Sequence, residues 1–172
     1  MTYLRIPGGD PAATNYERVF SLAPEVYQHW GALSQSVKAG MDLRRYELVT
    51  LVAALRIGAS YCSLAHAGVL RDRFYDDATL QAITTDWHDA GLEPVDVAVM
   101  DFADLVATDP GKVTAADADP LRAHGLSEQD IFHVILAVSI RRFFGGVLQA
   151  TGAEPDQNLF DALTPELGHL LA

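Results

Sequence analysis

Cys62, His66 and Glu47 are the residues of this chain whose types and spacing could do chemistry together. Cys62 is the only cysteine among 172 residues, and His66 follows it by four positions. Residues four apart on a helix share a face, so the thiol and the imidazole can touch if the segment after Gly58 is helical. A thiolate formed there would attack a peroxide oxygen and become a sulfenic acid. Glu47, inside an apolar run upstream, could orient the imidazole as the third member of a hydrolase triad does.

Each of these residues also has a purely structural explanation. A cysteine near a helix N-terminus can have a pKa below the ordinary value of about 8.5. A lone cysteine in an apolar helix, however, is most often a small core residue. Glu47 can simply pair with Arg44, Arg45 or Arg56. The residues alone therefore leave a reactive site and a packed core both open.

Helices must position these side chains, and the hydrophobic pattern predicts an all-α chain with almost no strand. The helices 43–57 and 60–73 are expected to form a central antiparallel hairpin with the candidate chemistry at its bend. The expected helices and their signals are 24–37 after Pro24, 43–57 capped by Asp42 and ended by Gly58, 60–73 capped by Ser60, 77–90 ended by Gly91, one from Pro94, and one opened by Ser127 with Asp130.

The spacing resembles the signature of the alkylhydroperoxidase D-like and carboxymuconolactone decarboxylase superfamily. That signature is a glutamate, then Cys-x-x-Cys, then a histidine four residues after the second cysteine. Glu47, Cys62 and His66 match it, whereas the first cysteine is replaced by Ala59. Further residues resemble the peroxidase-related branch of the superfamily, namely Trp87, Ala90–Leu92, Ala103–Leu105, Pro110, Leu121–Arg122, Gly125–Ser127 and Phe143–Phe144.

The resemblance implies a multi-helical bundle and a thiol-dependent peroxidase, an antioxidant oxidoreductase that reduces hydroperoxides through Cys62 with His66 and Glu47 as its catalytic partners. In the full motif the first cysteine resolves the sulfenic acid as a disulfide. With Ala59 in that place, an external thiol reductant has to do so. Two alternatives stay open: a carboxymuconolactone decarboxylase-like lyase on a small lactone acid, with proton transfer by His66 and Glu47, and a non-catalytic helical oligomer that binds a small molecule.

A faint internal repeat relates two stretches of the chain. Shifting Leu43–Ala67 by 83 positions places it on Leu126–Ala150, with Glu47 on Asp130 and Cys62 on Gly145. The second copy would therefore lack the thiol. Coincidence between two apolar helices explains the match equally well, so a degenerate repeat is only one of two interpretations.

Composition narrows the class of protein. The length fits one domain, 1–172, with residues 1–15 as an N-terminal arm around a Pro-Gly-Gly-Asp-Pro loop. A net charge of -11 argues against nucleic acid, and no uninterrupted apolar run has the roughly 20 residues that cross a bilayer. The N-terminus lacks a signal-peptide pattern, and a lone cysteine suits a reducing interior. We therefore expect a cytoplasmic protein.

The remaining polar residues suggest few further sites. The other histidines lack ligand spacing, so neither a metal nor another cofactor is predicted. The stretch 141–146, with Arg141 and Arg142, could meet an anionic substrate, or could be a partner surface or a solvated basic turn. The predicted helix 43–57 has apolar side chains nearly all round its axis, and so does the helix 131–140. This pattern, together with the resemblance, predicts a homo-oligomer, a dimer, trimer or hexamer.

Overall fold

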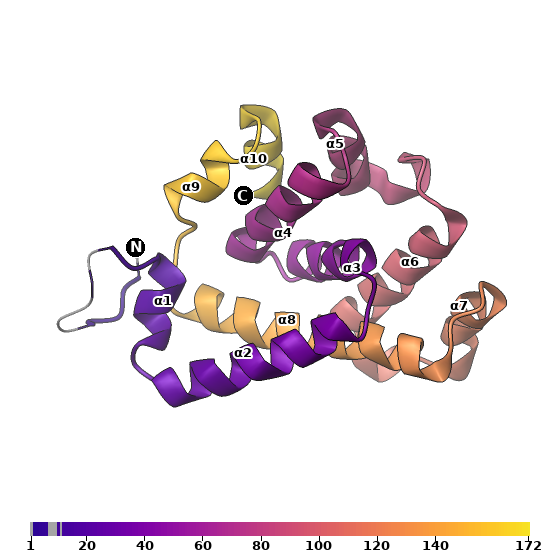
Figure 1. The fold of residues 1–172 in the computed structure, drawn as a ribbon, viewed down its shortest axis with the longest axis horizontal. Helices are drawn as coiled ribbons and strands as arrows, with labels where there is room; N and C mark the ends of the chain where they lie inside the picture. The colour runs from indigo at the N-terminus through magenta and orange to yellow at the C-terminus, as the bar shows by residue number, and fades with distance from the viewer. Residues whose placement is uncertain (1, 7–9, 11) are drawn as a thin grey trace.

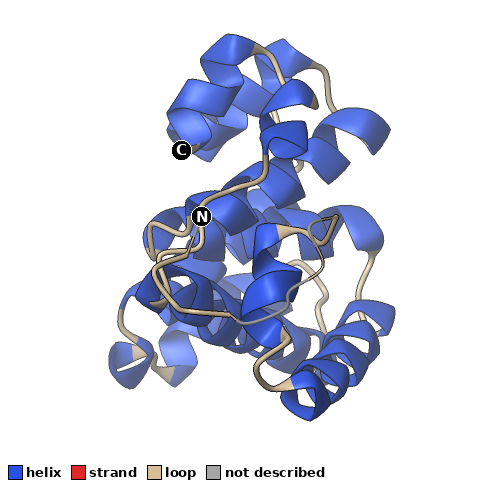
Figure 2. Cartoon of the chain, turned by 90° about the vertical axis from the view of Figure 1, so that its left-hand side faces the viewer, coloured by secondary structure: helices blue, strands red, loops and turns tan. Residues whose placement is uncertain are grey.

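The structure is a computed structural model that describes residues 2–6, 10 and 12–172. In that part of the chain every regular element is helical, which confirms the predicted all-α class (Figure 2). In chain order the elements are α1 (Asn15–Phe20), α2 (Pro24–Ala39), α3 (Leu43–Arg56), α4 (Ser60–Arg73), α5 (Asp77–Asp86), η1 (Trp87–Asp89), α6 (Pro94–Thr108), η2 (Pro110–Lys112), η3 (Ala115–Ala118), α7 (Asp119–Ala123), α8 (Glu128–Ala150), α9 (Gln157–Asp161) and α10 (Pro165–Leu171).

Helix α3 lies at the centre of the bundle and packs against α4, α6 and α8 (Figure 1). Its side chains from Tyr46 to Ala54 are all buried. The neighbouring helices of the same chain therefore cover α3, although it is apolar nearly all round. The expectation that α3 needs a second subunit to cover it is wrong, because the sequence pattern does not reveal how completely α4, α6 and α8 surround one helix.

The hairpin of α3 and α4 has a three-residue bend, Ile57–Gly58–Ala59. Gly58 has φ 67°, a left-handed conformation that glycine adopts without steric cost, so it ends α3 as predicted. The expected cap at Ser60 is wrong. Ala59 is the N-cap, because its carbonyl oxygen already accepts the N–H groups of Cys62 and Ser63. Ser60 is the first helical residue, and its hydroxyl donates to the carbonyl oxygen of Ala172.

The other predicted helix starts agree with the structure. The Asp42 carboxylate accepts the backbone N–H of Arg45 at 3.1 Å and caps α3. Ser127 and Asp130 form a reciprocal capping box at the start of α8. Aspartate is long enough to reach back to the N-cap N–H, at 2.8 Å.

The faint repeat does not extend to secondary structure. The shift of 83 positions places Gly58 on Arg141, yet α8 continues through Arg141 without a bend. The first stretch is a helix, a turn and a helix, whereas the second is one helix. Only glycine provides the left-handed turn easily, so a residue such as arginine in its place favours a continuous helix. Asp130, the counterpart of Glu47, is a capping residue.

Helix α8 runs alongside the bend and is the longest helix described. By length and composition alone it could cross a membrane, but half of its most apolar stretch is buried in the bundle, and the core helices of many proteins have the same character. Near its end, the hydroxyl of Tyr3 donates to the carbonyl oxygen of Ala150. Residues 7–9 and 11 of the predicted N-terminal loop lie outside the described residues.

Gly145 allows α8 to lie close to the bend. A methyl group at Gly145 would lie 2.8 Å from Ile57 Cδ1 and 3.0 Å from Ala59 Cβ. The isoleucine side chain can rotate away, but Ala59 Cβ moves only with its backbone. We therefore expect Gly145→Ala to lower the free energy of unfolding by about 1–3 kcal/mol, as overpacking does. Urea denaturation measures this change.

Gly146→Ala is the matched control, because a methyl group at Gly146 meets nothing within 4 Å. Alanine replaces glycine inside a helix there, so this variant should be more stable by roughly 0.5–1 kcal/mol. Equal effects of the two substitutions would contradict the close contact between α8 and the bend.

Candidate functional site

Glu47 and His66 meet across the interface of α3 and α4. The Glu47 side chain is 1% exposed, and its Oε2 accepts a hydrogen bond from His66 Nδ1 at 2.6 Å. Its Oε1 accepts one from Lys38 Nζ of α2 at 2.8 Å. The structure thus joins the predicted glutamate and histidine, and it adds a lysine that the sequence analysis did not consider.

The alternative partners of Glu47 are engaged elsewhere. Arg44 and Arg45 both form ion pairs with Asp96, and Arg56 pairs with Asp104. The structural explanation that paired Glu47 with these arginines is therefore wrong. Arg45 and Lys38 lie seven residues apart around the turn between α2 and α3, and spacing alone could not tell which of them reaches the carboxylate.

The electrostatics of the pair fix its protonation state. Burial acts to raise the pKa of Glu47, but the hydrogen bonds from His66 and Lys38 outweigh burial and hold that pKa below its ordinary value. Burial lowers the pKa of His66 to about 4, and the positive charge of Arg141 acts in the same direction. At neutral pH the carboxylate is charged and the imidazole is neutral. Its Nδ1 carries the proton donated to Glu47, which leaves the Nε2 lone pair free to accept another.

Cys62, the third residue of α4, is 2% exposed. Its thiol accepts a hydrogen bond from Nη1 of Arg141 on α8, with 3.6 Å between nitrogen and sulfur. Among the described residues no hydrogen bond joins Cys62 and His66, although both lie on α4 four residues apart, as their spacing predicted. The ring nitrogen Nδ1 points to Glu47 instead.

The expected low pKa of Cys62 is also not found. Burial raises the pKa of the thiol, and the Arg141 guanidinium only partly opposes this. Position near a helix N-terminus was the reason to expect a lowered value, but desolvation of the thiolate dominates at a site this deep. The resting thiol is therefore protonated at neutral pH.

Cys62 and His66 nevertheless line one cavity of about 200 Å³. The other lining residues are Tyr16, Tyr27, Trp30, Tyr61, Ala65, Arg141 and Phe144. We call the five aromatic residues of this set the aromatic wall. Trp30 stacks on Tyr27 and on Phe144, with 4.1 Å between the ring centroids of Trp30 and Phe144. Tyr16 meets Tyr61 and Phe144 edge-on. The arrangement suits a small, largely apolar molecule held beside the thiol and the imidazole.

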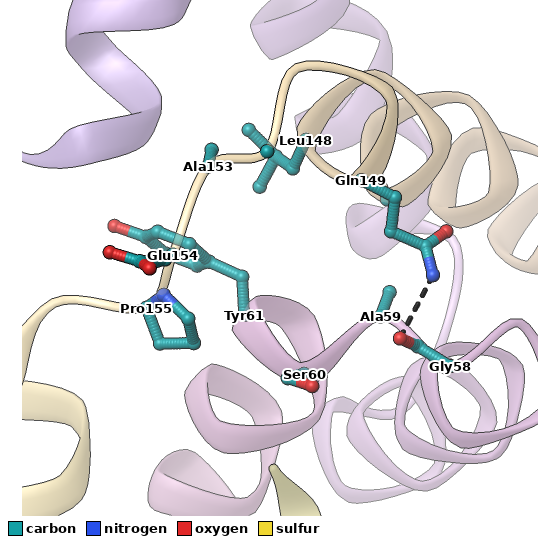
Figure 3. A pocket seen from close by; sticks show the side chains of 11 residues that line it. Gly58, Ala59, Ser60, Tyr61, Leu148, Gln149, Ala153, Glu154 and Pro155 are labelled. Carbon is teal, nitrogen blue, oxygen red and sulfur yellow. Dashed lines mark hydrogen bonds between the residues drawn. The ribbon is translucent and has the colours of Figure 1, made fainter. Parts of the chain in front are cut away.

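A second cavity, of about 360 Å³, lies between the bend with the start of α4 and the end of α8 (Figure 3). Ala59, where the resembling signature has its first cysteine, lines this second cavity, and Tyr61 lines both. The amide of Gln149 donates to the carbonyl oxygen of Ile57 at 2.7 Å and to that of Gly58 at 2.9 Å, and fixes the bend; Figure 3 shows the bond to Gly58.

Several functional residues were missed or only half found. Lys38 and most of the aromatic wall were not linked to the site, because α1, α2, α4 and α8 bring these side chains together from distant parts of the chain. Arg141 was noted for a possible anionic substrate but was not linked to Cys62. Within residues 2–6, 10 and 12–172, no group of three or more histidine, cysteine or acidic side chains is arranged to hold a metal ion.

Comparison with known proteins adds structures but no sequence relatives: neither a family model nor a curated protein matches the chain. The core of an alkylhydroperoxidase AhpD-type protein, an uncharacterised peroxidase-related protein from Ralstonia eutropha JMP134, superposes with a TM-score of 0.78 over 85% of this chain and 78% of that one, at 19% identity. The fold is AhpD-like.

Two further structures share the AhpD-like fold. A peroxidase-related protein from Silicibacter sp. TM1040 has a TM-score of 0.75 and 19% identity, covering 92% of this chain and 93% of that one. A cysteine-to-alanine variant of the debrominase Bmp8, in complex with 2,3,4-tribromopyrrole, has a TM-score of 0.76 and 15% identity. The match covers 89% of this chain and 81% of that one. At these identities the likeness establishes the fold.

Proposed function

We propose that this AhpD-like chain is a thiol-dependent oxidoreductase that reduces small hydroperoxides through Cys62. The observation that carries the proposal is the buried Glu47–His66 pair at the wall of a cavity that also contains the only thiol of the chain. A neutral imidazole oriented by a carboxylate is a proton acceptor and donor. The peroxidase-related neighbours support the same class of activity.

The reaction begins when the Cys62 thiol transfers its proton, through the bound hydroperoxide or a water molecule, to Nε2 of His66. Glu47 stabilises the imidazolium, and Arg141 stabilises the thiolate. The sulfur attacks the terminal peroxide oxygen, so that an S–O bond forms as the O–O bond breaks. The leaving alkoxide takes the proton from His66, which yields an alcohol and a Cys62 sulfenic acid.

Reduction of the sulfenic acid needs a thiol from outside, because the chain has one cysteine. One external thiol forms a mixed disulfide with Cys62 and releases water. A second external thiol then attacks that disulfide and restores the Cys62 thiol, so two external thiols end as one disulfide.

Trapping of the sulfenic acid tests the proposal. With one equivalent of cumene hydroperoxide and no reductant, we expect the released alcohol to equal the Cys62 that reacts with dimedone, measured by mass spectrometry. His66→Gln should slow this step by roughly a hundredfold or more, as loss of a general acid–base does. Absence of both alcohol and adduct would exclude a peroxidase.

A lyase is the second candidate, because Nε2 of His66 is free and the Cys62 pKa is raised. In this case His66 and Glu47 transfer a proton of a small lactone acid, and Cys62 is a bystander. Cys62→Ser would then retain turnover, whereas a peroxidase would lose it.

We further propose that the protein is a homo-oligomer that uses an apolar face on α2 and α8. Val26, Leu33 and Phe143 are 49%, 50% and 45% exposed there, and with Trp30 they line a hollow of about 340 Å³. Trp30 also belongs to the aromatic wall, so a subunit seated on this face would cover one side of the site. Light scattering at micromolar concentration tests this, and a mass of 18.6 kDa at every concentration would contradict it.

A further inference from the structure

Arg141 is the only buried cation in the described part of the chain. It is 5% exposed, and no carboxylate lies within ion-pair distance of it among those residues. Its Nε–H has no hydrogen-bond acceptor there. It donates a weak hydrogen bond to the Cys62 sulfur and lies over the face of the Phe144 ring, with 5.7 Å between the guanidinium carbon and the ring centroid.

The other arginines of α3 and α8 have carboxylate or carbonyl partners. Arg44 and Arg45 share the buried carboxylate of Asp96, and Arg142, next to Arg141 in sequence, donates to the carbonyl oxygens of Val106 and Ala107. A buried charge without such partners is costly in a folded protein, since it has lost its hydration and gained little in return. A sulfur and an aromatic face compensate only part of that cost.

No group that lines the cavity supplies the missing negative charge. His66 is neutral at pH 7, and the nearby Glu47 carboxylate is already matched by Lys38 and His66. The remaining walls are aromatic rings, Ala65 and a protonated thiol. The cavity therefore has one uncompensated positive charge at a wall that is otherwise apolar or neutral.

We propose that Arg141 binds the anionic head group of the substrate, in the first instance a carboxylate, while its unsaturated or aromatic body lies against Trp30 and Phe144. A planar guanidinium matches a carboxylate in shape and in donors. The inference deepens the proposed function by naming the substrate class as small organic acids that carry a hydroperoxide. Because Nη1 lies 3.6 Å from the sulfur, the carboxylate and the reacting oxygen must be close together in such a molecule.

Equilibrium binding tests the inference without any turnover. We expect calorimetry to show that the wild-type protein binds benzoate at least about tenfold more tightly than benzamide, its neutral analogue of similar shape, as a charge-assisted hydrogen bond does. Arg141→Met should abolish that preference and leave benzamide binding unchanged. Arg142→Met is the matched control and should retain the preference, since Arg142 contacts carbonyl oxygens of α6.

Further variants separate this inference from the proposed reaction. Cys62→Ser should retain the preference for benzoate although a peroxidase would lose turnover, so the two proposals can fail independently. If Arg141→Met does not fold, Arg141→Lys replaces it in the test. This variant should show a smaller preference for benzoate over benzamide, because lysine lacks the planar guanidinium. Equal affinity of the wild-type protein for benzoate and benzamide, no binding of benzoate, or an unchanged preference in Arg141→Met each overturns the inference.

Discussion

Cys62→Ser is expected to lower hydroperoxide turnover by about a thousandfold or more, as loss of a catalytic nucleophile does. A serine hydroxyl keeps the size of the group and can still accept the hydrogen bond from Arg141, but it does not attack a peroxide oxygen. The melting temperature should change little in comparison. Turnover is measured as hydroperoxide consumed in the presence of a small dithiol, which replaces the external reductant.

Ser63→Ala is the matched control for this variant. Ser63 is the next residue of α4, is equally buried, and donates its hydroxyl to the Ala59 carbonyl oxygen rather than to the cavity. Removal of the Ser63 hydroxyl should leave hydroperoxide turnover within about twofold of the wild-type rate, as changes outside the reacting groups usually do. If Cys62→Ser keeps hydroperoxide turnover as Ser63→Ala does, Cys62 is not the nucleophile and the thiol-dependent mechanism is contradicted.

Sequence reasoning predicted most of the helices because their signals are local. Pro24, Asp42, Gly58 and the Ser127 capping box each determine a helix end through the geometry of a few neighbouring residues. The same reasoning failed at Ser60. There the left-handed turn at Gly58 decides where the next helix begins, and the hydroxyl finds a partner 112 residues away.

The candidate site was only half predictable for a related reason. Glu47 and His66 belong to consecutive helices, so a hairpin brings them together once its bend is known. Arg141 lies 79 residues from Cys62, and periodicity within α8 does not say which helix that arginine faces. Burial also raises the pKa of the thiol, where position at a helix N-terminus predicted a lower value. How deeply a residue is buried depends on the packing of the whole bundle.

Acidification is expected to destabilise the protein through His66. Its ordinary pKa is 6.5, whereas burial lowers the folded pKa to about 4. As the pH falls between these values, the unfolded chain binds a proton that the folded chain does not, so the free energy of unfolding decreases. A shift of this size corresponds to a loss of roughly 3 kcal/mol when complete. Glu47, whose folded pKa is also lowered, adds to the loss below pH 4.5.

Urea unfolding at pH 7 and pH 5 measures the part of this loss that occurs above pH 5. His66→Gln should reduce it, because glutamine does not titrate but can still donate to Glu47. His88→Gln is the contrasting control. The exposed His88 has a raised pKa, owing to its hydrogen bond with Asp86, so its contribution is present at low pH and is lost as the pH rises. Removing it should make the acid loss slightly larger. An equal loss in His66→Gln and wild type would mean that His66 has the same pKa in the folded and the unfolded protein, so that burial does not lower it.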